Sequence, residues 1–520
     1  MTGRLPDAAQ QALGLEVVSA VAPRAVPAAR VRFESGDRGG LWVGNVRLAR
    51  YLKEGGFGWV VRLVDFLERE VDFGGFEAAC KPGGRPPIHP RVLVGLFVYG
   101  MLLRQWSLRE LEALSRRDVG AWWVCAGLTP DHSTLGRFAL QHRQLLTEDF
   151  FLQVTRAAVK KLGLTAGVVA GDGTVVEAAS AMASTLKRAA LEEAAKEAKA
   201  QAAAAPQDVQ AQAQVQALAV AQAALEEREA VREAAGKPVE GVRVSPYEPE
   251  AMVQPRKDGA VRPAYKPGVL VHEARLILGQ SLHPSSETAQ VEGLLVQHGQ
   301  VMEALPKAGL WDAGFLKTAL LKLAVEVELD VLIPSGKAKG EEDFTRANTR
   351  GLFAKADFTY DEEKDVYTCP SGATLAPTPP QTDAQGRTYR DYTTRACKDC
   401  PLREKCTRSG RGRRVKRYEG EALKEAMALA LEQPRARALY KRRAAIVEPV
   451  FAELRERQGL KRFHRKGRAK VAMEFALHCT AYNLKRVVGR TAMLLRLILA
   501  VRLPGTPWRL VDWALLLYAP

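Results

Sequence analysis

The feature that most limits what this chain can fold into is a set of short apolar runs that meet acidic residues. Asp172 interrupts the run Val-Val-Ala-Gly-Asp-Gly-Thr-Val-Val, and Asp312 follows Gly-Leu-Trp. Short apolar runs bounded by glycine are typical of buried strands. Glu448 lies in a basic stretch with helical character. Two carboxylates at adjacent strand ends and a third on a covering helix can hold a pair of Mg²⁺ or Mn²⁺ ions, an arrangement suited to phosphodiester chemistry.

The order of the predicted elements indicates one fold class. A strand with Asp172 is followed by an insert, two strands over 262–272 and 274–283 that can pair antiparallel, a helix, a strand with Asp312, a helix and a further strand. A second insert and two helices, the first of which carries Glu448, complete the series. This is the order of a ribonuclease-H-like mixed sheet flanked by helices. We therefore predict an α/β fold that brings the three acids together.

Helices are predicted before the first of these strands. Residues 41–160 have helical periodicity, with Pro90 near the start of an apolar helix, Ser107 at the start of a capping-box spacing and Asp131 as another cap. Short helices with arginine on their faces fit either a DNA groove or a plain helical bundle, and the pattern alone favours neither. Residues 1–40 lack periodicity and predict a loose N-terminal arm.

Two inserts divide the predicted core. Residues 185–241 are rich in Ala, Glu, Gln and Lys and predict helix throughout, with a break at Pro206 that makes a hairpin. Such a hairpin fits a solvated insert or an arm that contacts a partner helix. The first parts of the predicted core are residues 161–184 and 242–335. A cysteine-containing insert is predicted over 336–425, the C-terminal core helices over 426–490 and an apolar tail over 491–520.

Cysteine usage separates one cluster from the rest. The chain has seven cysteines, an odd number that argues against a secreted disulfide framework and favours a reducing compartment. Four of them fall in the second insert and match four-thiolate zinc binding in type and number, although their spacing is irregular. The alternative is a reduced cluster without a metal. The candidate ligands of a structural Zn²⁺ are Cys369, Cys397, Cys400 and Cys406.

Positive charge dominates the chain. The formal net charge is +17, which favours a polyanionic partner, either nucleic acid or an anionic membrane surface. Residues 435–470 hold 13 Lys or Arg against three Glu. A basic run is often only a solvated face, but beside Glu448 it predicts a DNA-binding track. The apolar run near the C-terminus is interrupted by charges and prolines, so no membrane-spanning segment is predicted.

With these motifs in place, the chain resembles the DDE transposases of bacterial insertion sequences. Asp172-Gly-Thr looks like the first catalytic block of that family, and Asp312-Ala-Gly-Phe is similar to the second. The segment 440–463 looks like the block around the final glutamate, with Arg455 where many relatives have lysine. Residues 93–138 resemble the helical domain that precedes such cores. The resemblance covers roughly residues 60–490 and is carried by the ordered set of motifs.

The resemblance implies a two-metal DNA enzyme. Asp172, Asp312 and Glu448 would be its catalytic residues and would bind two Mg²⁺ (or Mn²⁺) ions for phosphodiester hydrolysis at the element ends and strand transfer into target DNA. In the related Tyr-x-x-Arg-x-x-x-Glu pattern three residues separate Arg from Glu, whereas here four stand between Arg443 and Glu448. The residues expected to contact DNA are Tyr440, Arg443, Arg455, Lys461, Arg462, Arg465 and Lys466.

The resemblance also implies partners and a location. The partners are double-stranded DNA, both as terminal inverted repeats and as target, and a second copy of the chain in a homodimer. The location is the bacterial cytoplasm, at the nucleoid when DNA is bound. Two alternatives stay open: a domesticated or degraded relative that acts as a nuclease, and a non-catalytic DNA-binding protein. A pure DNA-binding protein has no reason to assemble three carboxylates, so the acids discriminate between these hypotheses.

Overall fold

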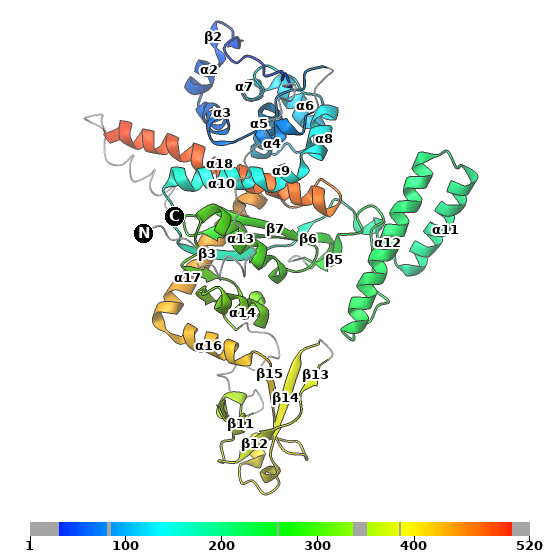
Figure 1. The fold of residues 1–520 in the computed structure, drawn as a ribbon, viewed down its shortest axis with the longest axis vertical. Helices are drawn as coiled ribbons and strands as arrows, with labels where there is room; N and C mark the ends of the chain where they lie inside the picture. The colour runs from blue at the N-terminus through cyan, green and yellow to red at the C-terminus, as the bar shows by residue number, and fades with distance from the viewer. Residues whose placement is uncertain (1–30, 81–84, 257–258, 336–350, 384–385, 502–520) are drawn as a thin grey trace, which may run out of the picture.

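The computed structural model describes residues 31–80, 85–256, 259–335, 351–383 and 386–501, and side chains as far as residue 489. Within these ranges the chain is a mixed α/β protein with three sheets and many helices (Figure 1), which confirms the predicted α/β class. Most of the predicted N-terminal arm and the end of the predicted apolar tail lie outside the described residues.

A seven-stranded mixed sheet forms the centre. Its strand order is β4-β6-β3-β8-β9, with β5 and β7 also paired to β6. β3 is antiparallel to β6 and parallel to β8, β8 is parallel to β9, and β6 is antiparallel to β7. The predicted antiparallel pair and the strands that carry Asp172 and precede Asp312 are therefore confirmed. The strands are β3 (Val168–Gly173), β4 (Val176–Glu177), β5 (Met252–Pro255), β6 (Val261–His272), β7 (Ile277–His283), β8 (Ala308–Leu310) and β9 (Val331–Leu332).

Close packing in the sheet explains its glycines. Trp311, which is fully buried, directly follows β8. Its ring lies against Gly171 and Gly309, and a Cβ at either glycine would collide with the indole. These two positions therefore need a residue without a side chain, and the Gly-Asp-Gly and Gly-Leu-Trp-Asp patterns follow from that packing.

Helices cover one face of the sheet and build a second layer above it. α10 and α18 pack on each other, and α18 also packs on α5, α9 and β7, so these two helices lie between the sheet and the N-terminal helices (Figure 1). The predicted helix starts are confirmed: Pro90 stands in the first turn of α5, Ser107 and Glu110 form the capping box of α6, and Asp131 caps α8. The elements are β1 (Trp42–Val43), β2 (Val46–Arg47), α2 (Leu48–Glu54), α3 (Gly58–Glu70), α4 (Gly74–Ala78), α5 (Pro90–Leu102), α6 (Leu108–Arg117), α7 (Val119–Val124), α8 (His132–Gln141), α9 (Arg143–Thr147), α10 (Asp149–Leu162) and α18 (Arg468–Val501).

The remaining helices of the core include α17, which carries Glu448, and the helices connected to it by packing. α17 packs against β3 and β6, and α16 joins α14 to α17 by packing on both. The core helices are α13 (Val291–Met302), α14 (Thr318–Glu326), α16 (Glu421–Glu432) and α17 (Pro434–Ala452). None of the helices in the described part of the chain is long and apolar enough to cross a membrane.

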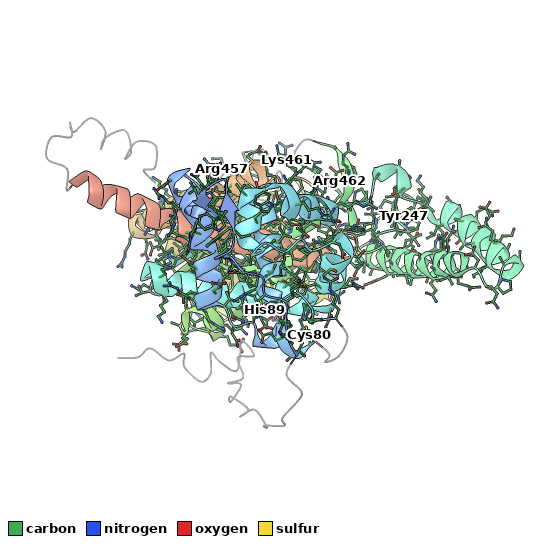
Figure 2. All side chains as sticks on the ribbon, turned by 90° about the horizontal axis from the view of Figure 1, so that it is seen from above. Cys80, His89, Tyr247, Arg457, Lys461 and Arg462 are labelled. Atoms are coloured by element: carbon green, nitrogen blue, oxygen red, sulfur yellow. The ribbon has the colours of Figure 1, made fainter. Side chains whose placement is uncertain are left out.

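Two further units project from this core (Figure 1). α11 (Arg188–Ala204) and α12 (Val209–Ala234) form the predicted hairpin, with Pro206 in the turn between them, and Figure 2 shows from a second side that the hairpin stands away from the body. Leu191, Leu218 and Leu225 fill the seam between its helices.

The second unit is a six-stranded sheet of short antiparallel strands. It has a small core of its own, with Phe358, Tyr367, Leu375, Tyr392 and Val415 buried. Its elements are β10 (Thr359–Asp361), β11 (Val366–Thr368), β12 (Thr374–Pro377), β13 (Gln381–Thr382), β14 (Thr388–Thr393), α15 (Arg403–Cys406) and β15 (Arg414–Tyr418). This unit is called the β unit below.

Candidate active site

Strand register brings Asp172 and Asp312 side by side. Ala170 of β3 pairs with Leu310 of β8, and each aspartate follows its paired residue by two positions. Because the two strands are parallel, both side chains emerge at the same edge of the sheet. One oxygen of each carboxylate is held locally: Asp172 Oδ1 accepts the Gly173 N–H at 2.8 Å, and Asp312 Oδ1 accepts the Gly314 N–H at 2.9 Å.

The other oxygen of each carboxylate faces one cation. Arg443 Nη2 lies 3.1 Å from Asp172 Oδ2 and 3.9 Å from Asp312 Oδ2. The Arg443 side chain is 12% exposed, Asp172 is 20% exposed and Asp312 is 43% exposed. A single guanidinium from α17 therefore neutralises part of the repulsion between two carboxylates at the sheet edge.

Burial makes the charge on Asp172 unfavourable. Desolvation raises the pKa of Asp172, and the neighbouring carboxylates Asp312 and Glu287 raise it further. Arg443 and the Gly173 N–H act in the opposite direction, but they do not bring the pKa down to its ordinary value. A site that strains the ionised form of a carboxylate gains from any additional cation placed between the two acids.

Two more residues that were predicted to contact DNA lie close enough to Asp172 to interact with its charge. Tyr440 lies one helical turn before Arg443, and burial raises the pKa of its phenol, while Arg443 lowers it and Asp312 and Asp172 raise it. Burial lowers the pKa of Arg455, and the charge of Asp172 raises it. The structure thus gathers Tyr440, Arg443 and Arg455 within electrostatic range of Asp172.

Glu448 lies on the same helix but faces another direction. Its residue is exposed, whereas its neighbours Val447 and Val450 are buried. Among the described residues, no group of three or more His, Cys, Asp or Glu side chains is placed to hold a metal ion. The five-position step from Arg443 to Glu448 explains the divergence, because it corresponds to about 140° of rotation around an α-helix, whereas a four-position step corresponds to about 40°.

The helix is irregular where it carries Glu448. Pro449 stands inside α17 and cannot donate to the carbonyl of Ala445, and that carbonyl instead accepts the Arg275 side chain Nε–H at 3.0 Å. A π-helical turn, Glu453–Arg457, follows α17 directly. Single π turns are frequent at functional sites.

The basic loop 457–467 joins three parts of the molecule. Arg462 Nε donates to the Ala178 carbonyl at 3.1 Å, next to the strand that follows Asp172. The Lys466 ammonium lies 5.2 Å from the ring centre of Tyr247, which is 68% exposed at the base of the helical hairpin. Figure 2 shows Arg457, Lys461, Arg462 and Tyr247 along one side of the molecule. Three exposed cationic side chains and an exposed tyrosine suit contact with a phosphate backbone.

Arg465 differs from the other basic residues of this loop. Its guanidinium lies 6.0 Å from the ring centre of Phe97, inside the N-terminal helices, and burial lowers its pKa. It was predicted as a DNA contact because it stands in the same basic run. Its position here fits a packing role that fixes the loop on the N-terminal helices.

A residue that sequence reasoning missed holds this loop. Glu474 is fully buried in α18, and its carboxylate accepts the backbone N–H groups of His464 at 3.0 Å and Arg465 at 2.9 Å. The His464 ring also stacks on Trp106 with ring centres 4.5 Å apart. The signal available in the sequence is a lone acid among apolar residues shortly after a basic loop, which indicates a buried hydrogen-bond acceptor.

The four clustered cysteines line one cavity in the β unit. The cavity is also lined by Phe353, Phe358 and Leu375. Cys369 Sγ lies 3.0 Å from Ser371 Oγ, and burial raises the pKa of Cys406, with the other three thiols adding to the effect of burial. The thiols therefore converge on one space, although their present orientations do not form a metal-ligand set within the described residues. All seven cysteines are free thiols.

Comparison with known families bears on both the site and the N-terminal helices. The model of a transposase DDE domain matches residues 368–488, which include the four clustered cysteines and Glu448. The model of a transposase domain (DUF772) matches residues 60–140, which span most of α3 to α8. A search of curated proteins found no match. The two family matches support a DDE-type transposase of an insertion element, as the sequence motifs predicted.

Proposed function

We propose that this chain is a DNA transposase that cleaves phosphodiester bonds at the ends of its element and joins the freed 3′-hydroxyl to target DNA. The observation that carries the proposal is the pair Asp172 and Asp312 at adjacent parallel strand ends, beneath a helix that belongs to a matched transposase DDE domain. Both acids direct a carboxylate oxygen at one cation. A pure DNA-binding protein would have no use for that arrangement.

The core supports the proposal through its topology. With the short strands β4 and β5 left out and β3 counted as the first strand, the order β7-β6-β3-β8-β9 places strands three, two, one, four and five side by side. Of these, β3, β8 and β9 are parallel. We propose that this sheet is ribonuclease-H-like, with the helical hairpin and the β unit as inserts. Ligands of mixed α/β sheets gather where parallel strands end, which is where Asp172 and Asp312 lie.

The donor set fits divalent ions such as Mg²⁺ or Mn²⁺. Carboxylate oxygens are the ligands that these ions prefer, and the two Oδ2 atoms already converge on a positive charge. Bound divalent ions would supply activation of a water or a 3′-hydroxyl and stabilisation of the leaving 3′-oxygen. We propose Glu448 as the third ligand, reached by a change in the turn of α17 that Pro449 and the adjacent π turn make accessible.

The DNA path is proposed to follow the basic loop. Lys461, Arg462 and Lys466 would bind the backbone, and Tyr440 and Arg455 would contact DNA closest to the carboxylates. The protein would act on terminal inverted repeats and on target DNA, and a homodimer would hold two element ends together. A nuclease or a binding protein derived from such an enzyme remains the alternative, and loss of cleavage in every acid variant would exclude only the binding protein.

A structural zinc site is proposed for the β unit because four thiols line one cavity. Rotation of thiol side chains about χ1 would bring the four sulfurs to a tetrahedral arrangement. Metal content of the purified protein tests this: one zinc per chain, lost in Cys397→Ser but retained in Cys80→Ser, is expected. Absence of zinc from protein prepared without chelators would contradict it.

Cleavage of labelled DNA that carries the element's own ends tests the main proposal. Wild type with Mg²⁺ or Mn²⁺ should release a 3′-hydroxyl end, and Asp172→Ala, Asp312→Ala and Glu448→Ala should not, although all three variants should still bind DNA. Cleavage that persists in Glu448→Ala would remove Glu448 from the site. Cleavage that persists in all three acid variants would end the proposal.

A further inference from the structure

Arg443 stands where a cation between the two aspartates would stand. We propose that Arg443 is an internal counter-ion that closes the carboxylate pair in the DNA-free enzyme and moves to a DNA phosphate when the metal binds. Metal and DNA would then bind cooperatively through this one side chain. The inference rests on the proposed function and adds to it the order in which the site is assembled.

The geometry separates Arg443 from an ordinary structural arginine. Its Nη2 contacts the Oδ2 atoms of Asp172 and Asp312, the same oxygens that face away from the backbone N–H groups of Gly173 and Gly314. Its Nε is buried and has no hydrogen-bond partner among the described residues. Within the described part of the chain the ion pairs of Arg443 are with these two carboxylates, so charge attraction to them holds the guanidinium in place.

A metal ion and this guanidinium compete for the two oxygens. Divalent ions bind carboxylate oxygens at about 2.0–2.6 Å, well inside the distances at which Arg443 now lies, so the two cations would repel each other at short range. The proposal is therefore that metal binding displaces Arg443. In the absence of DNA the displaced side chain has no replacement anion, and the affinity for metal is reduced accordingly.

DNA supplies that replacement anion. A guanidinium binds phosphate through two parallel N–H donors, so a phosphate at the carboxylate pair gives Arg443 a new partner as the metal takes the old one. By linkage, DNA then raises metal affinity, and metal raises DNA affinity by the same factor. Removal of Arg443 should raise metal affinity without DNA and abolish the coupling.

Mn²⁺ binding followed by electron paramagnetic resonance tests this without any activity measurement. The DNA probe is a pre-cleaved duplex that ends in a 3′-hydroxyl at the element terminus, and Mn²⁺ bound by the duplex alone is subtracted. In the wild type the duplex should raise Mn²⁺ affinity by about fivefold or more. Arg443→Ala should bind Mn²⁺ with that higher affinity already without DNA, and the duplex should add little.

The matched control is Arg442→Ala. Arg442 is adjacent on α17, but its guanidinium pairs with Glu273 instead of the aspartates, so this variant should behave as the wild type does. Asp172→Asn separates the two proposals: loss of Mn²⁺ binding there confirms the metal site, whereas retention contradicts the proposed function itself. With the metal site confirmed, equal DNA-free Mn²⁺ affinity in wild type and Arg443→Ala would overturn the inference. If Arg443→Ala does not fold, absence of DNA coupling in the wild type overturns it equally.

Discussion

The aspartate pair and the cysteine cavity are both sets of metal-type ligands, but they are assembled by different means. Asp172 and Asp312 emerge from the ends of rigid parallel strands and carry charge, so an internal cation, Arg443, accompanies them. The four thiols come from turns and a short helix, and an apolar wall with Phe353 and Phe358 surrounds them. Charged ligands need a counter-ion before a metal arrives, whereas neutral thiols pack as small apolar groups.

The largest effect is expected from the aspartate side of this comparison. Asp172→Ala and Asp312→Ala should each lower the rate of DNA cleavage on the order of 10³-fold or more, since each removes a ligand at the reacting phosphate. DNA affinity should change only by about the factor that couples metal and DNA binding, far less than the rate changes, because the basic loop is untouched. Single-turnover cleavage and fluorescence anisotropy measure the two quantities. A loss of DNA affinity that accounts for the whole loss of rate would show that these residues bind DNA rather than promote its cleavage.

The cysteine side should respond in stability rather than in chemistry. Cys397→Ser combined with Cys400→Ser should unfold the β unit, because its small core depends on the zinc proposed to bind there. The effect should stay local, with hydrogen exchange faster in residues 351–418 and unchanged in the central sheet. Removal of Mg²⁺ from the wild type should leave hydrogen exchange unchanged in both the β unit and the central sheet. A β unit that keeps its protection without the two thiols would show that apolar packing alone holds it.

A smaller effect, on stability, is expected from removal of the charge on Asp172, because the aspartate pair carries charge and the thiols do not. Asp172→Asn should raise the free energy of unfolding at neutral pH by about 0.5–2 kcal/mol, since an active-site charge held in an unfavourable place is removed. The folded-state pKa of Asp172 is raised above its unfolded value, so the native state binds more protons between the two values. The wild-type penalty therefore falls as pH decreases through the raised pKa, and the difference between the two proteins narrows. Thermal unfolding at a series of pH values measures this.

An advantage of Asp172→Asn that stayed constant from neutral to acid pH would mean that the buried charge is not its cause. A destabilised Asp172→Asn would mean that the Arg443 contact outweighs the desolvation of the carboxylate.

The smallest effect is expected along the basic loop. Lys466→Ala should reduce the slope of log affinity against log salt concentration by about one, the change for one phosphate contact. Arg465→Ala should leave that slope unchanged and lower thermal stability, since its guanidinium packs on Phe97 inside the N-terminal helices. The pair serves as its own control because the residues are adjacent. A salt slope that falls in Arg465→Ala instead would return this residue to the DNA contacts.

Local sequence patterns predicted the main strands, the helix caps and the fold class. The strands around Asp172 and Asp312, the break at Pro206 and the caps at Ser107 and Asp131 follow from apolar runs, proline geometry and capping chemistry, which are properties of a few adjacent residues. The α/β class follows from the order of these elements. Strand register then places the two aspartates together without further information.

Local sequence patterns could not predict which side chains from distant segments come together. Glu448 and Arg443 share a helix, and which of them faces the sheet depends on the rotational phase of α17 against β3 and β6. Arg443 was predicted as a DNA contact, and in the structure without DNA its guanidinium lies between the two aspartates, which no local pattern indicated. Glu474 and Arg465 acquire their roles only when α18 packs against the N-terminal helices, a contact between segments far apart in the chain.

The most direct test of the account is anomalous diffraction from crystals of the protein grown with Mn²⁺ and a pre-cleaved duplex. The account predicts an anomalous peak within bonding distance of Asp172 Oδ2 and Asp312 Oδ2, with the Arg443 guanidinium moved from these oxygens to a phosphate. A map without Mn²⁺ at the aspartates, and with Arg443 still between them, would contradict it.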